Sequence, residues 1–249
     1  MRICLMGNSH MAAWKAGYDE MVAAGEWSPS VNVTFFASPS DGLLDIGVSV
    51  DHRALVAPEG GELRTQLERT SGGIPHIRPD DYDHIILVGM VRVPDLDHRF
   101  SSSLIEEIFS GTKHYCGAAK LMPRVRSITD RPVYVVPQPL TTNPQSAYPE
   151  NYEPIPYIER LAGVDDALAA HGVIVMGQPS ETLLEPQRTK PEMSSSAPRL
   201  DLGQWDRVGS KHPATDYFHM NGAFGRLSWI ALLEAIGGDP SRREAPPIQ

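Results

Sequence analysis

The chain has 249 residues and a formal net charge of −9, with 41% hydrophobic and 21% charged residues, a composition ordinary for a globular protein. No apolar run has the length of a membrane span. Lysines and arginines are scattered along the chain, which argues against nucleic acid and anionic membrane surfaces as partners.

Strand-like and helix-like segments alternate along the chain. Five short apolar runs predict strands at Arg2–Met6, Val31–Phe36, His84–Met90, Pro132–Val136 and Val173–Met176. Helical spacing predicts helices over His10–Ala24 and around residues 104–109, 158–168 and 227–236, the last ending at Gly237-Gly238. This alternation predicts a doubly wound, flavodoxin-like three-layer α/β sandwich around a central parallel sheet of about five strands.

The rest of the chain is predicted to be irregular, over Ala37–Gly73, Thr141–Pro154 and Gly177–Thr215. We expect one domain spanning residues 1–249, with a long loop insertion around 177–215 that forms a lid or a wall for substrate. Ligands of such sheets bind at the carboxyl ends of the strands.

The N-terminal residues Met1–Met6 are too short for a signal peptide and lead directly into a turn. We therefore expect the mature chain to begin here and to be cytoplasmic. The two cysteines, Cys4 and Cys116, form neither a disulfide framework nor a metal-binding spacing.

A serine follows the first predicted strand, in the turn Gly7-Asn8-Ser9-His10. A serine hydroxyl is a weak nucleophile until a base removes its proton. At the start of a helix, free N–H groups and the positive end of the helix dipole favour a developing oxyanion beside it. The alternative is that Ser9 only caps the helix.

The spacing Asp-x-x-His, in which the Asp can orient the His as a general base, occurs at three places. Asp81/His84 opens a strand that looks buried, and we interpret it as incidental. Asp95/His98 follows the strand ending at Met90 and is a reserve candidate.

The third pair, Asp216/His219, lies directly before the last predicted helix and is the leading candidate. His212 and His114 have no partner pattern and are expected to be surface residues.

A serine after the first strand, with Asp and His before the last helix, resembles the SGNH/GDSL hydrolase family. Gly7–His10 matches its nucleophile block, and Asp216–Asn221 its Asp-x-x-His block. The resemblance implies a triad of Ser9, His219 and Asp216. The lipase motif G-x-S-x-G is absent around Ser9, which lowers the α/β-hydrolase alternative.

Members of this family also have a glycine after the second strand and a Gly-x-Asn-Asp block after the third, where Gly and Asn help to bind the oxyanion. Gly42 matches the first, but the second block reads Gly89-Met90-Val91-Arg92 and lacks the Asn. Loss of one oxyanion donor costs roughly 3–4 kcal/mol of transition-state stabilisation. Arg92 is a candidate substitute or a solvated side chain, and His10 is a pocket donor or an ordinary helix-start histidine.

Three functions follow. The first is an esterase or deacylase for a small-molecule or carbohydrate ester, with no metal or organic cofactor. The second is an acyltransferase that uses the same triad on a sugar or polysaccharide acceptor. The third is a degenerate member of the family that binds a ligand without turnover, favoured by the missing Asn. The oligomeric state is not predicted.

Overall fold

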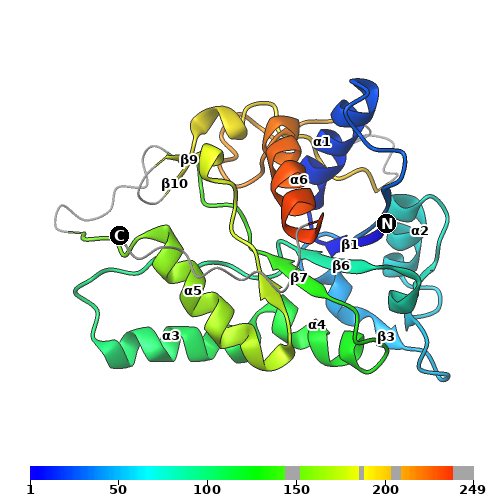
Figure 1. Ribbon diagram of the computed structural model, residues 1–249, viewed down its shortest axis with the longest axis horizontal. Helices are drawn as coiled ribbons and strands as arrows, with labels where there is room; N and C mark the ends of the chain where they lie inside the picture. Colours follow the sequence, from blue (N-terminus) through cyan, green and yellow to red (C-terminus); the bar gives the residue numbers. More distant parts are fainter. Residues whose placement is uncertain (144–151, 185–187, 203–208, 238–249) are drawn as a thin grey trace.

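The computed structural model describes residues 1–143, 152–184, 188–202 and 209–237. Its centre is a parallel sheet of β1 (Arg2–Gly7), β2 (Asn32–Ala37), β6 (His84–Val88), β7 (Val133–Val136) and β8 (Ile174–Val175). The order across the sheet is β2-β1-β6-β7-β8, and all four neighbouring pairs are parallel (Figure 1). This order is that of flavodoxin-like sheets. The predicted fold class and the five predicted strands are confirmed.

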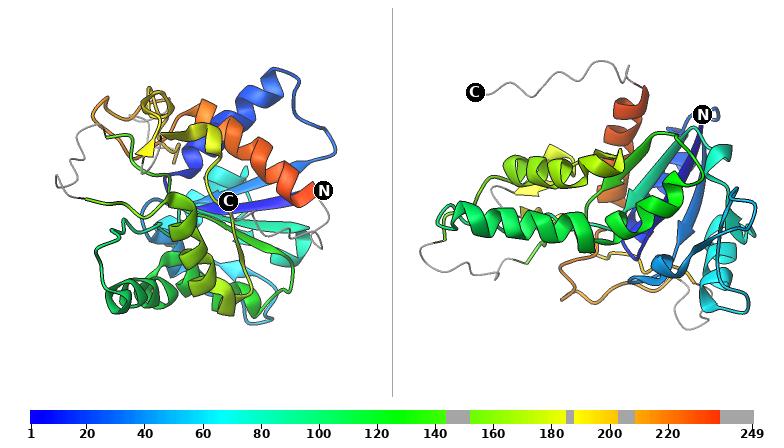
Figure 2. Two further views of the ribbon diagram at one scale, coloured as in Figure 1. Left: turned by 60° about the vertical axis from the view of Figure 1, so that its left-hand side comes forward. Right: turned by 90° about the horizontal axis from the view of Figure 1, so that it is seen from below.

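Helices cover both faces of the sheet (Figure 2). One face carries α1 (Met11–Ala23) and α6 (Gly222–Gly237). The other carries α2 (Glu62–Ser71), α4 (Gly117–Arg126) and α5 (Tyr157–Leu168), with α3 (Ser102–Tyr115) packed against α4 and α5. Alternate residues of β1 divide between the two cores, because side chains of a strand point to opposite faces in turn.

Two helices and a small sheet were not predicted. Helix α2 lies inside the supposedly irregular 37–73 segment, and only Leu63 and Leu67 give it an apolar face. Helix α4 contains Pro123, a residue that normally marks a helix boundary. An antiparallel sheet is formed by β3 (Gly47–Val48), β4 (Leu55–Val56) and β5 (His76–Ile77). Strands of two residues carry no readable alternation, so sequence patterns miss them.

The predicted long insertion contains regular structure in its described parts. It includes the antiparallel strand pair β9 (Leu183–Leu184) and β10 (Arg188–Thr189), and an isolated bridge joins Pro198 to Lys211. Short 3₁₀ turns lie at Gly42–Asp45, Pro79–Asp81, Ala169–His171, Ser180–Thr182 and Pro191–Met193. None of the described helices is both long enough and apolar enough to cross a membrane.

The backbones of α1 and α6 touch. A Cβ added to Gly225 would lie 1.9 Å from the carbonyl oxygen of Ala13, and one added to Gly17 would lie 2.3 Å from the Arg226 nitrogen. The Trp229 Nε1–H donates to the carbonyl oxygen of Trp14 at 2.8 Å across the same contact. These glycines therefore permit an approach that no side chain allows, and it brings together the chain segments preceding both helices.

We expect Gly225→Ala to destabilise the protein by about 1–3 kcal/mol, because the added methyl group overlaps a helix backbone that has no room to move. The matched control is Gly111→Ala, since Gly111 also lies in a helix but an added Cβ meets nothing within 4 Å. This control should be neutral or stabilising by up to about 1 kcal/mol. Urea unfolding of both variants measures the difference, and equal stability would contradict the close contact.

Candidate active site

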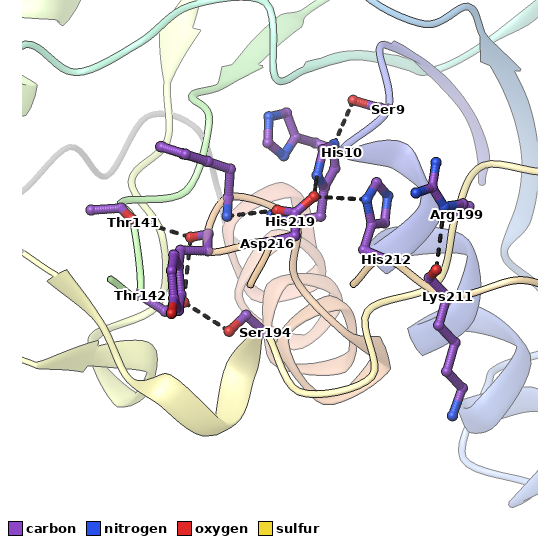
Figure 3. A network of polar contacts seen from close by, with 12 residues as sticks. Ser9, His10, Thr141, Thr142, Ser194, Arg199, Lys211, His212, Asp216 and His219 are labelled. Atoms are coloured by element: carbon purple, nitrogen blue, oxygen red, sulfur yellow. Dashed lines mark hydrogen bonds and ion pairs between the residues drawn. The ribbon is translucent and has the colours of Figure 1, made fainter. Parts of the chain in front are cut away.

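Ser9 lies in the turn between β1 and α1, at the carboxyl edge of the sheet. The residue at the capping position of α1 is His10, whose side chain makes no capping hydrogen bond. The Ser9 Oγ instead lies 2.9 Å from His219 Nε2 (Figure 3). The N-cap alternative for Ser9 therefore does not hold.

His219 in turn contacts Asp216, with 2.9 Å between Nδ1 and Oδ2. The other carboxylate oxygen of Asp216 accepts the backbone N–H groups of Phe218 at 2.9 Å and His219 at 3.1 Å. Burial raises the pKa of Asp216, but these hydrogen bonds outweigh it and hold that pKa at about 2. Asp216 is therefore ionised at neutral pH.

His212 is a member of this cluster, which corrects its expected position on the surface. Its Nδ1 lies 2.8 Å from the same Asp216 oxygen, and its ring stacks on that of His219 with centroids 3.8 Å apart. The His212 backbone N–H donates to the Ala197 carbonyl at 2.8 Å, beside the bridge at Pro198. This long-range pairing places His212 at the site. Such a pairing has no local sequence pattern from which it could be predicted. His114 is exposed, as expected.

The carboxylate of Asp216, shared by two histidines, determines which ring nitrogen of each histidine carries a proton. An ionised carboxylate only accepts hydrogen bonds, so His212 and His219 must each carry a proton on Nδ1. The Nε2 atom of neutral His219 is then bare and accepts the Ser9 hydroxyl proton. The geometry is that of a general base ready to activate a serine.

Ligand atoms of His212, Asp216 and His219 lie within 4.8 Å of one another, a spacing that suggests a metal ion. The two imidazole planes are, however, only 12° from parallel and are stacked. An ion binds in the plane of each imidazole through the nitrogen lone pair, and stacked planes do not meet at one point. One ring would have to turn away before both could hold an ion.

His10 stacks on His219 with centroids 5.2 Å apart. Its Nδ1 is buried and has no hydrogen-bond partner among the residues that the structure describes. Burial, assisted by the neighbouring His219, lowers the pKa of His10 to about 3. His10 is therefore neutral in the folded protein, and it lines a cleft next to the cluster, while its role as a pocket donor stays a prediction.

Two hollows flank the turn after β6. A chamber of about 220 Å³ is lined by Asn8, Gly89 and Gln138, among others, and a cleft of about 40 Å³ by His10, Gln138 and Phe218. Arg92 lines both hollows; its side chain is 66% exposed and lies 3.6 Å from Asp95. Arg92 therefore stands at the mouth of the site.

Gly89 meets a strict steric requirement. Its φ is +74°, and a Cβ there would lie 2.4 Å from Asn8 Oδ1 and 2.9 Å from His10 Cδ2. Only glycine allows the turns after β1 and β6 to approach this closely.

The structure corrects the role expected for Gly42. Its N–H donates to the Pro39 carbonyl at 3.1 Å, so it is committed to a turn and is not available to an oxyanion. Ser40 and Asp41 line the larger chamber instead. Within the described chain, their N–H groups and that of Ser9 make no hydrogen bond. Ser40 has a φ of +51°, the left-handed conformation that glycine usually supplies.

The reserve pair does not face Ser9. Asp95 contacts Arg160 at 3.1 Å as well as Arg92, and His98 is exposed. The pair Asp81/His84 is likewise outside the cluster, with His84 at the start of β6.

The described part of the 177–215 segment is bound to the loop that carries Asp216 and His219. Asn221 Nδ2 donates to the carbonyl oxygens of Glu192 at 2.8 Å and Ser195 at 3.1 Å, and the Asn221 N–H donates to that of Met193 at 2.7 Å. Thr142 Oγ1 lies 2.7 Å from Ser194 Oγ (Figure 3). This part of the segment therefore supports the histidine loop.

No protein-family model matches the chain, and no curated protein matches its sequence. Solved structures of similar fold include a lipopolysaccharide acetyltransferase periplasmic domain from Salmonella ser. Paratyphi A (10% identity, TM-score 0.46, covering 95% of this chain and 84% of that one). Another is an aryl esterase of M. smegmatis (13% identity, TM-score 0.41, covering 95% of this chain and 98% of that one). A third is an extracellular lipase from Streptomyces rimosus (11% identity, TM-score 0.44, covering 94% of this chain and 99% of that one). Similarity at this level carries no weight for activity.

The desolvated ring of the partly buried His10 makes stability depend on pH. Its pKa falls from 6.5 to about 3 on folding, so below about pH 6.5 the unfolded chain binds a proton that the folded chain does not. This group alone then removes up to about 1.4 kcal/mol of stability for each unit by which the pH falls.

The variant His10→Phe retains a ring and loses the titration. We expect its unfolding free energy to fall less than that of the wild type as the pH is lowered from about 6.5 to 5. Equal slopes for the two proteins in urea titrations would show that His10 is not kept neutral by the fold.

Proposed function

We propose that this chain is a serine esterase or deacylase of the SGNH/GDSL type. The observation that carries the proposal is the continuous chain of hydrogen bonds from Ser9 through His219 to Asp216, with both links at 2.9 Å. A ligand-binding module has no need of an aligned nucleophile, base and carboxylate, so the degenerate-member alternative is disfavoured.

The reaction starts when His219 Nε2 takes the Ser9 proton as Ser9 Oγ attacks the ester carbonyl carbon. The carbonyl electrons move onto oxygen, where the N–H groups of Ser9 and of the Ser40–Asp41 turn are free to donate. His219 then protonates the departing alcohol, which leaves an acyl-enzyme. Water, deprotonated by His219, releases the acid. The residues perform these steps without a metal or organic cofactor.

The hollows favour a small-molecule or carbohydrate ester. A chamber of about 220 Å³ beside Asn8 and Gly89 accommodates a small acyl group such as acetyl. Arg92 at its mouth suits a polar or anionic portion of the substrate. The cytoplasmic location, and the exclusion of nucleic acid and membranes as partners, stay predictions from the sequence.

An acyltransferase is the second candidate, because a further chamber near the start of α1 offers room for an acceptor. About 320 Å³ in volume, it lies against the first turn of α1 at Met11 and Ala12, and residues 198–201 of the long insertion form part of its wall. None of the three triad residues lines this chamber, so a sugar bound there would have to extend a hydroxyl past the start of α1 to Ser9 to replace water in the second half of the reaction.

A fluorophosphonate probe tests for an activated serine. We expect the wild type to be labelled and to hydrolyse p-nitrophenyl acetate, and Ser9→Ala and His219→Ala to lose at least about 10⁴-fold of kcat/KM together with labelling. Asp216→Asn should lose about as much. The control is Ser103→Ala, because Ser103 is an exposed serine of α3. A wild type that neither labels nor turns over would contradict the proposal. Loss of hydrolysis with gain of transfer on adding a sugar would favour the second candidate.

His212 should act as a positioning residue. The variant His212→Phe preserves the ring stack and removes one donor from Asp216, which then holds protonated His219 more strongly. We expect kcat to fall about tenfold, the value of one ordinary hydrogen bond, and the acidic limb of the kcat/KM profile to move to higher pH. His114→Phe is the exposed control. An unchanged pH profile in His212→Phe would show that the shared carboxylate has no part in tuning the base.

A further inference from the structure

The carbonyl group of Gly89, a residue that lines the larger hollow, accepts hydrogen bonds from two side-chain amides. Asn8 Nδ2 donates to its oxygen at 2.7 Å, and Gln138 Nε2 donates at 3.0 Å. A carbonyl oxygen has two lone pairs, so both are filled. Because that oxygen only accepts, the nitrogen atoms of both amides must face it.

Each amide retains a second N–H group. Within the described part of the chain, neither of these remaining N–H groups makes a hydrogen bond. Both residues line the chamber of about 220 Å³, and Gln138 also lines the cleft that contains His10 and Phe218. Gln138 therefore lines both hollows and carries an unused donor.

The backbone of Gln138 is held rigidly. Pro137 and Pro139 flank it and restrict its backbone, and its N–H donates to the Val91 carbonyl at 2.8 Å. With the side-chain amide bonded to Gly89, the donor is oriented before substrate arrives. Preorganised donors of this kind stabilise charge without reorganisation during the reaction.

We propose that Gln138 is the third oxyanion donor of the site, in place of the Asn that is missing from Gly89-Met90-Val91-Arg92. This inference rests on the proposed function. As the bond from Ser9 Oγ to the carbonyl carbon forms, the electron pair of the C=O bond moves onto oxygen. The free N–H of Gln138 donates to that oxygen and loses no proton, while the Ser9 proton moves to His219.

The test compares an oxygen ester with its thiono analogue, in which C=S replaces C=O, because sulfur is a weak hydrogen-bond acceptor. In Gln138→Met, which has similar length and no donor, we expect kcat for phenyl acetate to fall about 10²- to 10³-fold with little change in KM. The ratio of kcat/KM for ester over thionoester should fall by the same order, since the thionoester gains little from the donor.

A second variant and a control keep the test sharp. Gln138→Glu preserves the shape and places a carboxylate beside the oxyanion, so it should be less active than Gln138→Met. Gln178→Met removes a buried amide that bonds Thr182 and Thr189 at 3.0 and 3.1 Å, so it should lower stability and leave the ester-to-thionoester ratio unchanged.

The outcomes separate the two claims. The proposed function stands if the wild type is labelled and turns over substrate while Ser9→Ala does neither. In that case the role of Gln138 is overturned if Gln138→Met retains the wild-type kcat, or if its activity toward the ester and the thionoester falls by the same factor. If the wild type neither labels nor turns over, both are overturned. A selective loss for the oxygen ester supports Gln138 as donor.

Discussion

The contact between the backbones of α1 and α6 determines whether this site exists. Ser9 precedes α1 and His219 precedes α6, and 210 positions of sequence separate the two residues. Their 2.9 Å hydrogen bond tolerates displacements of only about 0.5 Å. Gly17 and Gly225 remove the side chains that would otherwise set the separation of the helices, so the backbones themselves define it. The rigid contact between the two helices therefore positions Ser9 and His219 more precisely than loops alone would.

The parallel sheet performs a second task, which is to gather groups from distant parts of the chain at one edge. Asn8 follows β1, Ser40 follows β2, Gly89 follows β6 and Gln138 follows β7, and these four strands are neighbours. The order reverses between β1 and β6, which leaves a crevice where the loops diverge. The positive φ of Gly89 then closes the turns around Asn8 until amide and carbonyl meet.

Sequence patterns located the parts of this site that local structure encodes. Continuous apolar runs predicted the five strands, and the turn at Ser9 and the Asp-x-x-His spacing at His219 are short-range signals. The remaining parts depend on pairing at long range. The bridge between Pro198 and Lys211 brings His212 to the site, and Gln138, after β7, bonds Gly89, which follows the neighbouring strand β6. The prediction that Gly42 donates to the oxyanion is wrong for a different reason. The sequence places a glycine in the expected loop, but it does not show that the N–H of this glycine is already bonded within a turn.

The electrostatics of the cluster leave one path for a proton leaving Ser9. Burial lowers the pKa values of His10 and His212, which makes both rings weaker bases, and among the described residues it is the His219 ring that contacts the Ser9 hydroxyl. His219 contacts Ser9 on one nitrogen and an ionised carboxylate on the other, so the charge it gains is balanced at once. In the proposed mechanism this arrangement serves hydrolysis and acyl transfer alike, since His219 would deprotonate either water or a sugar hydroxyl. The choice between the two proposed reactions would therefore lie outside the triad, in what occupies the chambers once an acyl-enzyme has formed.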